Sequence, residues 1–521
     1  MRPESAGTDR GAPPNPPTVT PGPRRLGWAM QRRWGFVIAV LVMGIAAIAL
    51  WGAQRDGTEA TFGSVAVLPF TSDSPENRYL ADGLSEAVLN GLVQLQSLRV
   101  APRASATRFK GSVVGPGDAG RELGVATVVT ATVSQAEDDL KIQVDLVDVE
   151  RNSQIWGAQY SGSVSELIDL QAMIMQDLPR ALRVPLSDQD TRQLARRLTE
   201  NADAYRAYLK GRYEWSQRSE AALKRAIERF EEAVAIDPMF AAAYSGLADS
   251  YSILGYLSYL SPAETFPEAK RHATRALELD ASLAEAHASL GFVRLYFEWD
   301  WAGAEAEFRR AIELDPYHAA SHQWYSIYLL AAGESAAAFS EIQLAQQLDP
   351  LSLPVNTDLG FYYYYTGQYE EALKQLNLVL EMNPGFVPAH LWLGRSYQEL
   401  GRFDDALGAF RRVDDSIRDW PVSIAARGFV SGIAGRPALA RQALVELEQL
   451  SSQRFVTSYG VALIHAGLGQ NDAAFASLDK AYDERSNWLV WLRLDPRWNS
   501  LRADPRFSEL VRRMSFPSEA K

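Results

Sequence analysis

Residues 115–120 read GPGDAG and match G-x-G-x-x-G, the loop that holds a dinucleotide pyrophosphate at a helix N-terminus. Asp138 and Asp139 follow about twenty residues later, where such enzymes place a ribose-binding acid. The motif also needs a full strand before it and a full helix after it. Only residues 112–114 precede it, Gly124 ends the helix that follows, and the two acids fall in a hairpin turn. We therefore expect a loop that binds no dinucleotide.

Other residue types that support catalysis or metal binding lack the partners they need. His318 and His322 lie four positions apart on a predicted helix, but no third ligand is near them, and zinc sites use at least three protein ligands. Acidic pairs such as Glu370-Glu371 and Asp404-Asp405 stand at helix starts, where carboxylates favour the helix dipole. The chain has no cysteine, no G-x-S-x-G elbow and no H-E-x-x-H. We predict no catalytic residue, no metal and no cofactor.

An uncharged apolar stretch follows a tail rich in proline and arginine. Residues 1–33 hold seven prolines and six arginines against Glu4 and Asp9, with few large apolar groups, which predicts a disordered tail. Residues 34–53 carry no charge and are long enough to cross a hydrocarbon core of about 30 Å. Because the arginines precede this span, the positive-inside rule places the N-terminus in the cytoplasm. The sequence thus predicts a single transmembrane helix in a bacterial inner membrane, with the bulk of the chain in the periplasm.

A cleaved signal peptide is the alternative for the same stretch. Ala47-Ile48-Ala49 matches the A-x-A pattern of a cleavage site. The leading segment is long for a signal peptide, however, and the apolar run continues through Trp51. We expect an uncleaved anchor that contacts the lipid bilayer through residues 34–53.

Residues 62–187 read as a small α/β domain. Ser64–Phe70 is an apolar run typical of a buried strand, and a helical apolar period follows over residues 78–95. Residues 127–135 and 140–149 flank a turn, and the second run alternates apolar and polar residues, which predicts a hairpin with one wet face. A further strand is expected over residues 155–162. It is followed by a capping box that opens another helix.

The order of these segments resembles the TolB-like amino-terminal domain, a small α/β module of bacterial membrane regulators. The resemblance rests on SVAVLPF, YLADGLSEAVLNGL, LRVAPRASATRFKG, GRELGVATVVTATV and IWGAQYSG, and it covers about 120 residues. It implies a sensory or binding role and carries over no catalytic residue. The sequence departs from such regulators because residues 1–33 are too short for a winged helix or a kinase, and no Gly-Lys pair exists for a Walker A loop.

Small residues recur at nearly constant spacing between residues 200 and 515. They are separated by 35, 45, 35, 34, 34, 34 and 32 residues and stand at Gly211, Gly246, Gly291, Ser326, Gly360, Gly394, Gly428 and Gly460. Asp-Pro and Asn-Pro pairs such as Asp315-Pro316 and Asn383-Pro384 close several of the units. This pattern strongly resembles the tetratricopeptide repeat, a helix–turn–helix unit of 34 residues, and predicts an all-α solenoid of about eight helix pairs. The aromatic and basic end, residues 484–507, suits a cap over the last apolar face.

The tetratricopeptide resemblance implies a ligand groove lined by positions two, five, nine and twelve of each first helix. The residues of this sequence that stand at such positions and that we take as partner-binding candidates are Gln323, Phe361, Tyr364, Leu391, Arg395 and Gln398. Since successive helical residues point about 100° apart, the run Tyr362–Tyr365 cannot lie entirely in a core. Core packing of part of these aromatics remains the alternative.

The sequence therefore favours a protein with one transmembrane helix, a TolB-like α/β domain and a tetratricopeptide solenoid. A net charge of −12 argues against a nucleic-acid partner. We expect a non-catalytic, membrane-anchored interaction scaffold or sensor component that binds a protein or peptide through its groove. The alternative is a signal-transduction subunit, related to membrane cyclase, kinase or winged-helix regulators, whose output domain is a separate polypeptide.

Overall fold

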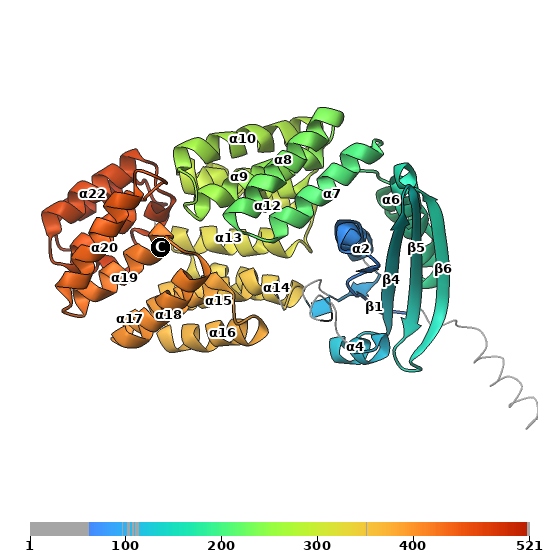
Figure 1. Ribbon diagram of the computed structural model, residues 1–521, viewed down its shortest axis with the longest axis horizontal. Coiled ribbons are helices and arrows are strands. Elements are labelled where there is room, and N and C mark those ends of the chain that lie inside the picture. The colour runs from blue at the N-terminus through green and yellow to red at the C-terminus, as the bar shows by residue number, and fades with distance from the viewer. Residues whose placement is uncertain are drawn as a thin grey trace, which may run out of the picture. The chain divides into compact units, whose positions relative to one another are not determined.

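A computed structural model of the chain describes residues 62–95, 97–101, 105–106, 109, 114–350 and 352–517. The predicted tail over residues 1–33 and the predicted span over residues 34–53 lie outside these residues. Within the described part of the chain, no helix has the length and apolar character needed to cross a membrane. This finding corrects the predicted fold class and the predicted single-pass inner-membrane localisation. What the structure contains is a mostly helical solenoid with a small mixed sheet (Figure 1).

The sheet region occupies the N-terminal part of the described chain. Its elements are β1 (Ser64–Val67), β2 (Thr71–Ser72), η1 (Pro75–Asn77), α2 (Arg78–Val93), β3 (Arg99–Val100), α4 (Pro116–Leu123), β4 (Thr127–Ala136), β5 (Asp139–Asp148), β6 (Ser153–Ser163), η2 (Val164–Glu166), α5 (Leu167–Ala181) and α6 (Asp188–Leu194). The strand order is β3-β1-β4-β5-β6, and β2 also pairs with β4. β1 runs parallel to β3 and β4, whereas β4, β5 and β6 form antiparallel pairs.

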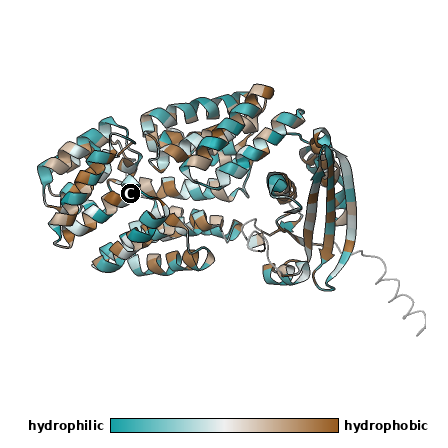
Figure 2. Ribbon diagram, in the orientation of Figure 1, coloured by the Kyte–Doolittle hydropathy of each residue, from teal (hydrophilic) through white to brown (hydrophobic). Residues whose placement is uncertain are grey.

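The two faces of this sheet are covered by different helices. Apolar residues alternate along β5, where Leu140, Ile142 and Val144 are buried and the residues between them are more exposed (Figure 2). This buried face packs against α2 and α5. On the other face, Val128 of β4 belongs to a smaller cluster that includes Ala119 of α4. The alternation along β5 therefore corresponds to one buried face and one wet face, as the sequence predicts, while α4 covers only part of the other face near β1 and β4.

The remaining helices pair along the chain. First and second helices of successive units are α7 (Ala202–Ser216) with α8 (Glu220–Ile236), α9 (Ala241–Tyr256) with α10 (Pro262–Leu279), α11 (Ala284–Val293) with α12 (Trp301–Leu314), α13 (Ala319–Ala332) with α14 (Ser335–Leu348), α15 (Leu353–Tyr365) with α16 (Tyr369–Met382), α17 (Val387–Glu399) with α18 (Phe403–Ser416), α19 (Pro421–Ile433) with α20 (Pro437–Leu450), and α21 (Ser458–Gly467) with α22 (Asn471–Asp483). A π-helical turn, η3 (Arg294–Glu298), extends α11. The chain ends with η4 (Asn487–Trp491), η5 (Pro496–Trp498) and α23 (Pro505–Arg513).

The recurring small residues lie where neighbouring helices come closest, within a unit at Gly211, Gly291, Gly360 and Gly394, and toward the preceding unit at Gly246 and Gly460. A Cβ placed on Gly360 of α15 would stand 2.7 Å from Cγ of Leu376 on α16. A Cβ on Gly394 of α17 would overlap the ring of Phe410 on α18 in the same way. Close helix packing therefore explains the repeat spacing that the sequence displays.

A polar contact recurs at the turn that joins one unit to the next. The Nε2 atoms of His287, His322 and His390 lie 3.2, 3.0 and 2.8 Å from the carbonyl oxygens of the residues six positions earlier. Asn356 Nδ2 donates in the same way to the carbonyl of Pro350, at 2.8 Å. We call this set of four contacts the turn lock. Each contact gives a hydrogen-bond partner to a main-chain carbonyl just after a helix, which would otherwise have none within the helix.

Candidate functional site

All six residues that the sequence places in the groove are buried. They lie on α13, α15 and α17, with exposed fractions of 7% or less. Gln323 donates a hydrogen bond to Asp358 at 2.5 Å, and Gln398 donates one to Glu399 at 2.7 Å. None of the six is thus part of a free surface in this structure. Their role in partner binding stays a prediction.

The chain itself covers two of these residues, Phe361 and Arg395. Residues 486–516, here called the C-terminal segment, place the Trp491 ring 4.6 Å from the rings of both Phe361 and Tyr365. Trp488 lies 4.8 Å from the guanidinium carbon of Arg395. Because Trp491 is 1% exposed, the segment is a built part of the core rather than a loose tail.

Hydrogen bonds fix the C-terminal segment to three early units of the solenoid. Asn487 Nδ2 donates to the carbonyl of Tyr256 at the end of α9, at 3.1 Å. Arg493 donates to the carbonyl of Ala332 at 2.7 Å, and Trp301 Nε1 donates to the carbonyl of Met514 at 3.1 Å. The segment also packs on the last unit, where Arg506 donates to Asp472 and Arg513 donates to Asp479 of α22. The sequence interpretation of a cap over the last unit therefore describes only part of its contacts, because the segment also reaches units far from its own end of the solenoid.

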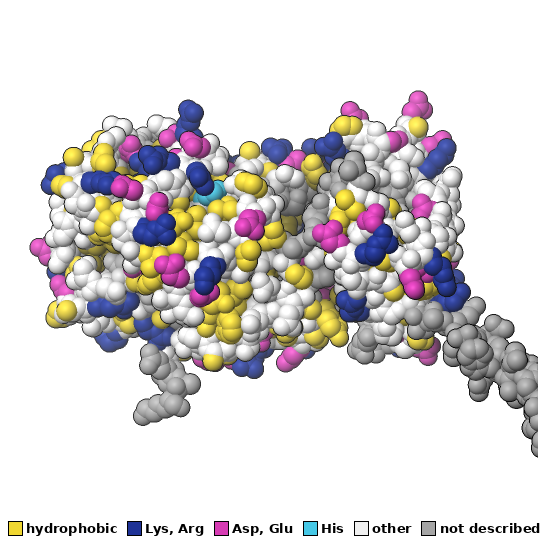
Figure 3. Space-filling model, turned by 90° about the horizontal axis from the view of Figure 1, so that it is seen from below, with side chains coloured by type: hydrophobic (Ala, Val, Ile, Leu, Met, Phe, Trp, Pro, Cys, Tyr) yellow, Lys and Arg dark blue, Asp and Glu magenta, His cyan; other side chains and the backbone are white. Residues whose placement is uncertain are grey.

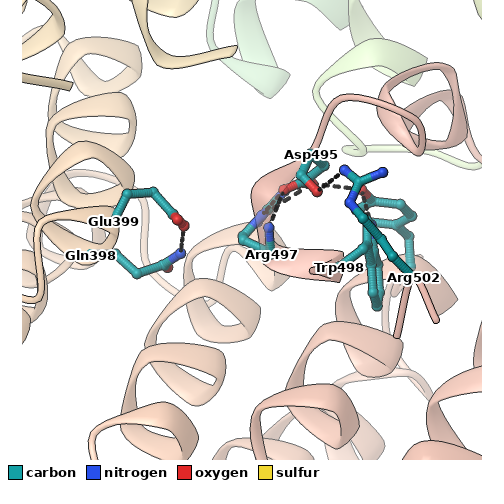
Figure 4. Close-up of polar contacts among 7 residues, drawn as sticks. Gln398, Glu399, Asp495, Arg497, Trp498 and Arg502 are labelled. Carbon is teal, nitrogen blue, oxygen red and sulfur yellow. Dashed lines mark hydrogen bonds and ion pairs between the residues drawn. The ribbon is translucent and has the colours of Figure 1, made fainter. Parts of the chain in front are cut away.

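A buried ion pair organises the middle of the C-terminal segment. Arg497 donates two hydrogen bonds to the Asp495 carboxylate, at 2.8 Å and 2.6 Å, and both side chains are almost fully buried (Figure 4). Tyr459 of α21 donates to the same carboxylate at 2.7 Å, and Trp498 Nε1 donates to the Tyr459 oxygen at 2.8 Å. These bonds hold the pKa of Asp495 below its ordinary value although burial opposes the charge. The network joins α21 to η5.

Two carboxyl groups beside this region have raised pKa values. Burial raises the pKa of Asp358 to about 7, although its hydrogen bond from Gln323 favours the charged form. Burial also raises the pKa of Glu399 to about 7, and the Asp495 charge contributes to that shift. Figure 4 shows Gln398 and Glu399 together on α17, apart from the Asp495 network. Both carboxyl groups therefore titrate near neutral pH.

The tyrosine run belongs to the core. Tyr362, Tyr364 and Tyr365 are buried in the main hydrophobic cluster, while Tyr363 packs against it and is partly exposed. The alternative of core packing thus accounts for three of the four rings. The Tyr364 hydroxyl has no hydrogen-bond partner among the described residues.

The opening motif GPGDAG forms the first turns of a helix rather than a loop. Its residues begin α4, after the N-cap Gly115, and Gly124 ends the helix in the left-handed region at φ 64°. Packing favours glycine most strongly at Gly120, where a Cβ would overlap the side chains of Val149 and Val128, whereas a Cβ on Gly117 would displace only the side-chain end of Asn152. The prediction of a loop, made because only residues 112–114 precede the motif and Gly124 ends the helix soon after it, is wrong for residues 116–120, which are helical. The residues pack on the sheet, and no dinucleotide geometry is needed to explain them.

The two histidines considered for a metal are held by other contacts. His322 Nδ1 lies 2.6 Å from Glu341, and its Nε2 belongs to the turn lock. Burial opposes its charge, but these two acceptors outweigh burial and raise the pKa of His322. His318 Nδ1 lies 2.8 Å from the Ser321 hydroxyl. Within the described residues, no group of three or more potential ligands could hold a metal ion.

An open hollow lies between the sheet region and the first helix pair of the solenoid. Its volume is about 220 Å³, and it is lined by Pro75, Glu76, Arg78, Tyr79, Lys210, Tyr213, Glu214 and Arg229. Burial and the charges of Arg206 and Arg229 lower the pKa of Lys210. Near it, Arg212 of α7 donates to Glu86 of α2 at 2.6 Å. We call this hollow the junction cavity; sequence reasoning did not anticipate it.

A comparison with known families supports the repeat assignment. The family model described as "Tetratricopeptide repeat" matches residues 363–426, which include α16 and α17. Together with the stacked helix pairs, this match confirms the prediction of a tetratricopeptide-repeat protein. The TolB-like resemblance of the sheet region is not tested by that match.

Curated relatives share only part of this chain. A protein of Rhizobium meliloti (strain 1021) that carries the name adenylate cyclase 3 is 27% identical over 234 residues, 44% of this chain. The transcriptional regulator HilA of Salmonella typhimurium is 26% identical over 145 residues, 28% of this chain. The matches span 39% and 26% of the lengths of these two proteins. The activities of the whole relatives therefore do not transfer to this chain.

Three solved structures of low similarity are pilF, PilW and YrrB. Pseudomonas aeruginosa pilF is 21% identical, with a TM-score of 0.31 over 42% of this chain and 94% of its own. PilW, described as a type IV pilus biogenesis factor, is 19% identical, with a TM-score of 0.33 over 41% of this chain and 93% of its own. YrrB, described as a TPR protein with an unusual peptide-binding site, is 21% identical, with a TM-score of 0.25 over 38% and 97%. With TM-scores this low, we draw no structural argument from them.

Sequence reasoning missed the C-terminal residues that pack against α15 and α17 or form the buried ion pair. Trp488, Trp491, Asp495 and Arg497 were all assigned to a terminal cap. A usable signal was present, because three tryptophans within eleven residues, ending at Trp498, exceed what a polar-faced cap requires. Such anchors resemble those by which a peptide binds a groove.

Proposed function

We propose that this chain is a non-catalytic interaction scaffold whose tetratricopeptide groove is occupied by its own C-terminal segment. The observation that carries the proposal is the packing of the C-terminal segment: Trp488 lies against Arg395, and Trp491 lies against Phe361. Aromatic and arginine contacts of this kind are those by which grooves bind peptides. These contacts support an intramolecular ligand for the groove that the repeat family implies.

A partner would then bind a surface outside the filled groove. Exposed apolar side chains on other parts of the solenoid include Met239 at 67% and Leu378 at 51% exposure. On the face drawn in Figure 3, cationic and anionic side chains are interspersed around hydrophobic ones, without a continuous field of one sign. The six groove candidates would contact a partner only if the C-terminal segment detached from α15 and α17. The proposal includes no nucleic-acid partner and no cofactor.

In-cell photo-crosslinking tests this arrangement. A photoreactive residue is placed singly at Met239, at Leu378 and at Phe361 of the full chain. We expect a partner protein to be captured from Met239 or Leu378, whereas Phe361 should crosslink only within the chain, to the C-terminal segment. Capture of a separate protein from Phe361 would contradict the self-occupied groove. The absence of any captured protein from all three positions would contradict the scaffold role.

A second function, a subunit of a signal-transduction system, is favoured by the names of the relatives. One carries the name of an adenylate cyclase and the other that of a transcriptional regulator. The resemblance of residues 62–187 to the TolB-like module supports the same function, and the junction cavity would give such a subunit a place for an input ligand. The captured partner decides between the two: a cyclase, a kinase or a DNA-binding protein favours the signalling role, and an assembly protein favours the scaffold.

A further inference from the structure

Strand β6 lies at an edge of the sheet (Figure 1). It pairs with β5 on one side, and no described strand pairs with its other side. The register slips by one residue at Ile155, which forms a β-bulge, so a regular edge runs from Trp156 to Ser163. Along such an edge, every second residue directs its main-chain N–H and C=O groups away from the sheet. These groups form a row of hydrogen-bonding sites that another strand can use.

The regular part of this edge lacks the side chains that prevent strand pairing. Natural edge strands are often protected by charged side chains, above all lysine, or by proline. Residues 153–163 read SQIWGAQYSGS and include neither a charged residue nor a proline. Gly157, Gln159 and Ser161 alternate along the wet face and are exposed. The edge is therefore neutral in a chain whose net charge is −12, and an identical edge meets no like charge directly opposite.

The strand is complementary to a second copy of itself. Opposed residues of an antiparallel pair lie on the same face of the sheet, so a two-fold axis between two copies passes through a residue. An axis at Gln159 uses the regular edge from Trp156 to Gly162 in both copies. It places Trp156 opposite Gly162 of the other copy, and an aromatic ring beside an edge glycine stabilises strand pairing. It also places Ala158 opposite Tyr160, on the face that packs against α5.

The helix that lies over this edge adds an exposed apolar side chain. Tyr160 of β6 donates to the Asp177 carboxylate of α5 at 3.0 Å. Met173 lies one turn before Asp177 on the same side of α5, and it is 49% exposed. Asp169 stands near the start of this side and Arg180 near its end, both exposed beside ion-pair partners of their own chain. In an antiparallel pair of copies, the acidic end of one α5 lies on the side of the basic end of the other, so the two helices have complementary charges.

We propose that β6 pairs antiparallel with β6 of a second copy of this chain, with the two-fold axis at Gln159. The dimer has one continuous sheet across both copies, and Met173 is covered at the junction. The observation that favours a second copy over a foreign strand is that the neutral edge and the charges of α5 both match themselves under this symmetry. The inference goes beyond the proposed function, because it concerns self-association through the sheet region and not the groove of the solenoid.

Disulfide crosslinking of the full chain tests the contact. The chain has no cysteine, so a single introduced thiol reports on it without background. In Gln159→Cys the two thiols lie opposite each other across the axis, where the Cβ atoms of paired residues are about 4.5–5.5 Å apart. Gln143 of β5 is the registered neighbour of Gln159, and in the dimer the two Gln143 positions are three strand spacings, about 14 Å, apart. We expect oxidation to link Gln159→Cys into a dimer and to leave Gln143→Cys unlinked. Failure of Gln159→Cys to link would overturn the proposal.

Sedimentation velocity over a range of concentrations measures the same equilibrium without a crosslink. We expect the wild-type chain to form dimers as its concentration rises. Gln159→Lys places two like charges opposite each other and should raise the Kd of the dimer by about fivefold relative to Gln143→Lys, which makes the same change in net charge one strand further in. A wild-type chain that stays monomeric at every concentration would leave the edge to a foreign strand and refute the dimer. Equal Kd values for the two lysine variants would place the contact elsewhere and contradict the assignment to β6.

Discussion

Replacing Trp491 with alanine should loosen the C-terminal segment. The side chain is 1% exposed and packs against the rings of Phe361 and Tyr365, each 4.6 Å away between centroids. Removing a buried tryptophan costs about 3–5 kcal/mol of the free energy of unfolding, because the contacts are lost and a cavity remains. For a solenoid of this length, that cost lowers Tm by roughly 5–8 °C.

Hydrogen exchange read by mass spectrometry locates the effect. In the Trp491→Ala variant, amides of the C-terminal segment and of α15 should exchange faster, while those of β4 and β5 should exchange as in the wild type. Tyr317→Ala, which removes an aromatic side chain that is 49% exposed, should change stability by no more than about 0.5 kcal/mol. If Trp491→Ala leaves both Tm and the exchange of the C-terminal segment unchanged, this ring does not hold the segment in the groove.

Two further predictions concern pH and packing. The pKa of the Asp358 carboxyl is about 7 in the folded chain and 3.8 in its ordinary state, so the folded chain binds its proton more tightly than the unfolded chain does. The stability that this proton contributes is fully present below about pH 4 and is lost as pH rises through 7. Asp358→Asn should therefore reduce the fall in Tm measured between about pH 5 and pH 8. An unchanged pH profile of Tm would count against titration of Asp358. Gly394→Ala should destabilise the solenoid by about 1–3 kcal/mol in urea unfolding, because its Cβ meets the Phe410 ring. Gly408→Ala on the open side of α18 should stabilise it by about 0.5–1 kcal/mol, and equal effects of the two changes would contradict the packing argument.

The repeat architecture was readable from the sequence because it rests on contacts between near neighbours. Gly360 and Leu376 are sixteen positions apart, and the same contact recurs in other units, so spacing alone reveals it. The first turns of the eight-residue helix α4 were not predicted, because proline and glycine are poor helix formers. The residues concerned are Pro116, Gly117 and Gly120. Packing against Val149 and Asn152 decides that segment, and a local pattern does not report such contacts.

The sequence did not show that the groove candidates would be buried. Family positions identified Phe361 and Arg395 as groove-lining candidates; in the structure both are buried and contact Trp491 and Trp488 of the C-terminal segment, and their role in partner binding stays a prediction. That the segment comes from the same chain depends on contacts such as Asn487 with Tyr256, which are 231 residues apart. No periodicity links residues at that separation. The charge pattern near Asp495 likewise gave no sign that the ion pair would be buried.

The turn lock determines where this solenoid can accept additional sequence. The turns over residues 280–283, 315–318 and 383–386 all have four residues, and in each case a histidine of the next helix bonds to the carbonyl six positions before it. The long 45-residue step between Gly246 and Gly291 leaves the first of these turns unchanged, and its extra length lies in α9, α10 and the residues that connect them. The junction over residues 451–457, between α20 and α21, has seven residues and no such histidine, so greater length is found where the turn lock is absent. A designer who wished to graft a foreign loop onto this protein would leave the locked four-residue turns intact and choose the exposed residues 451–453.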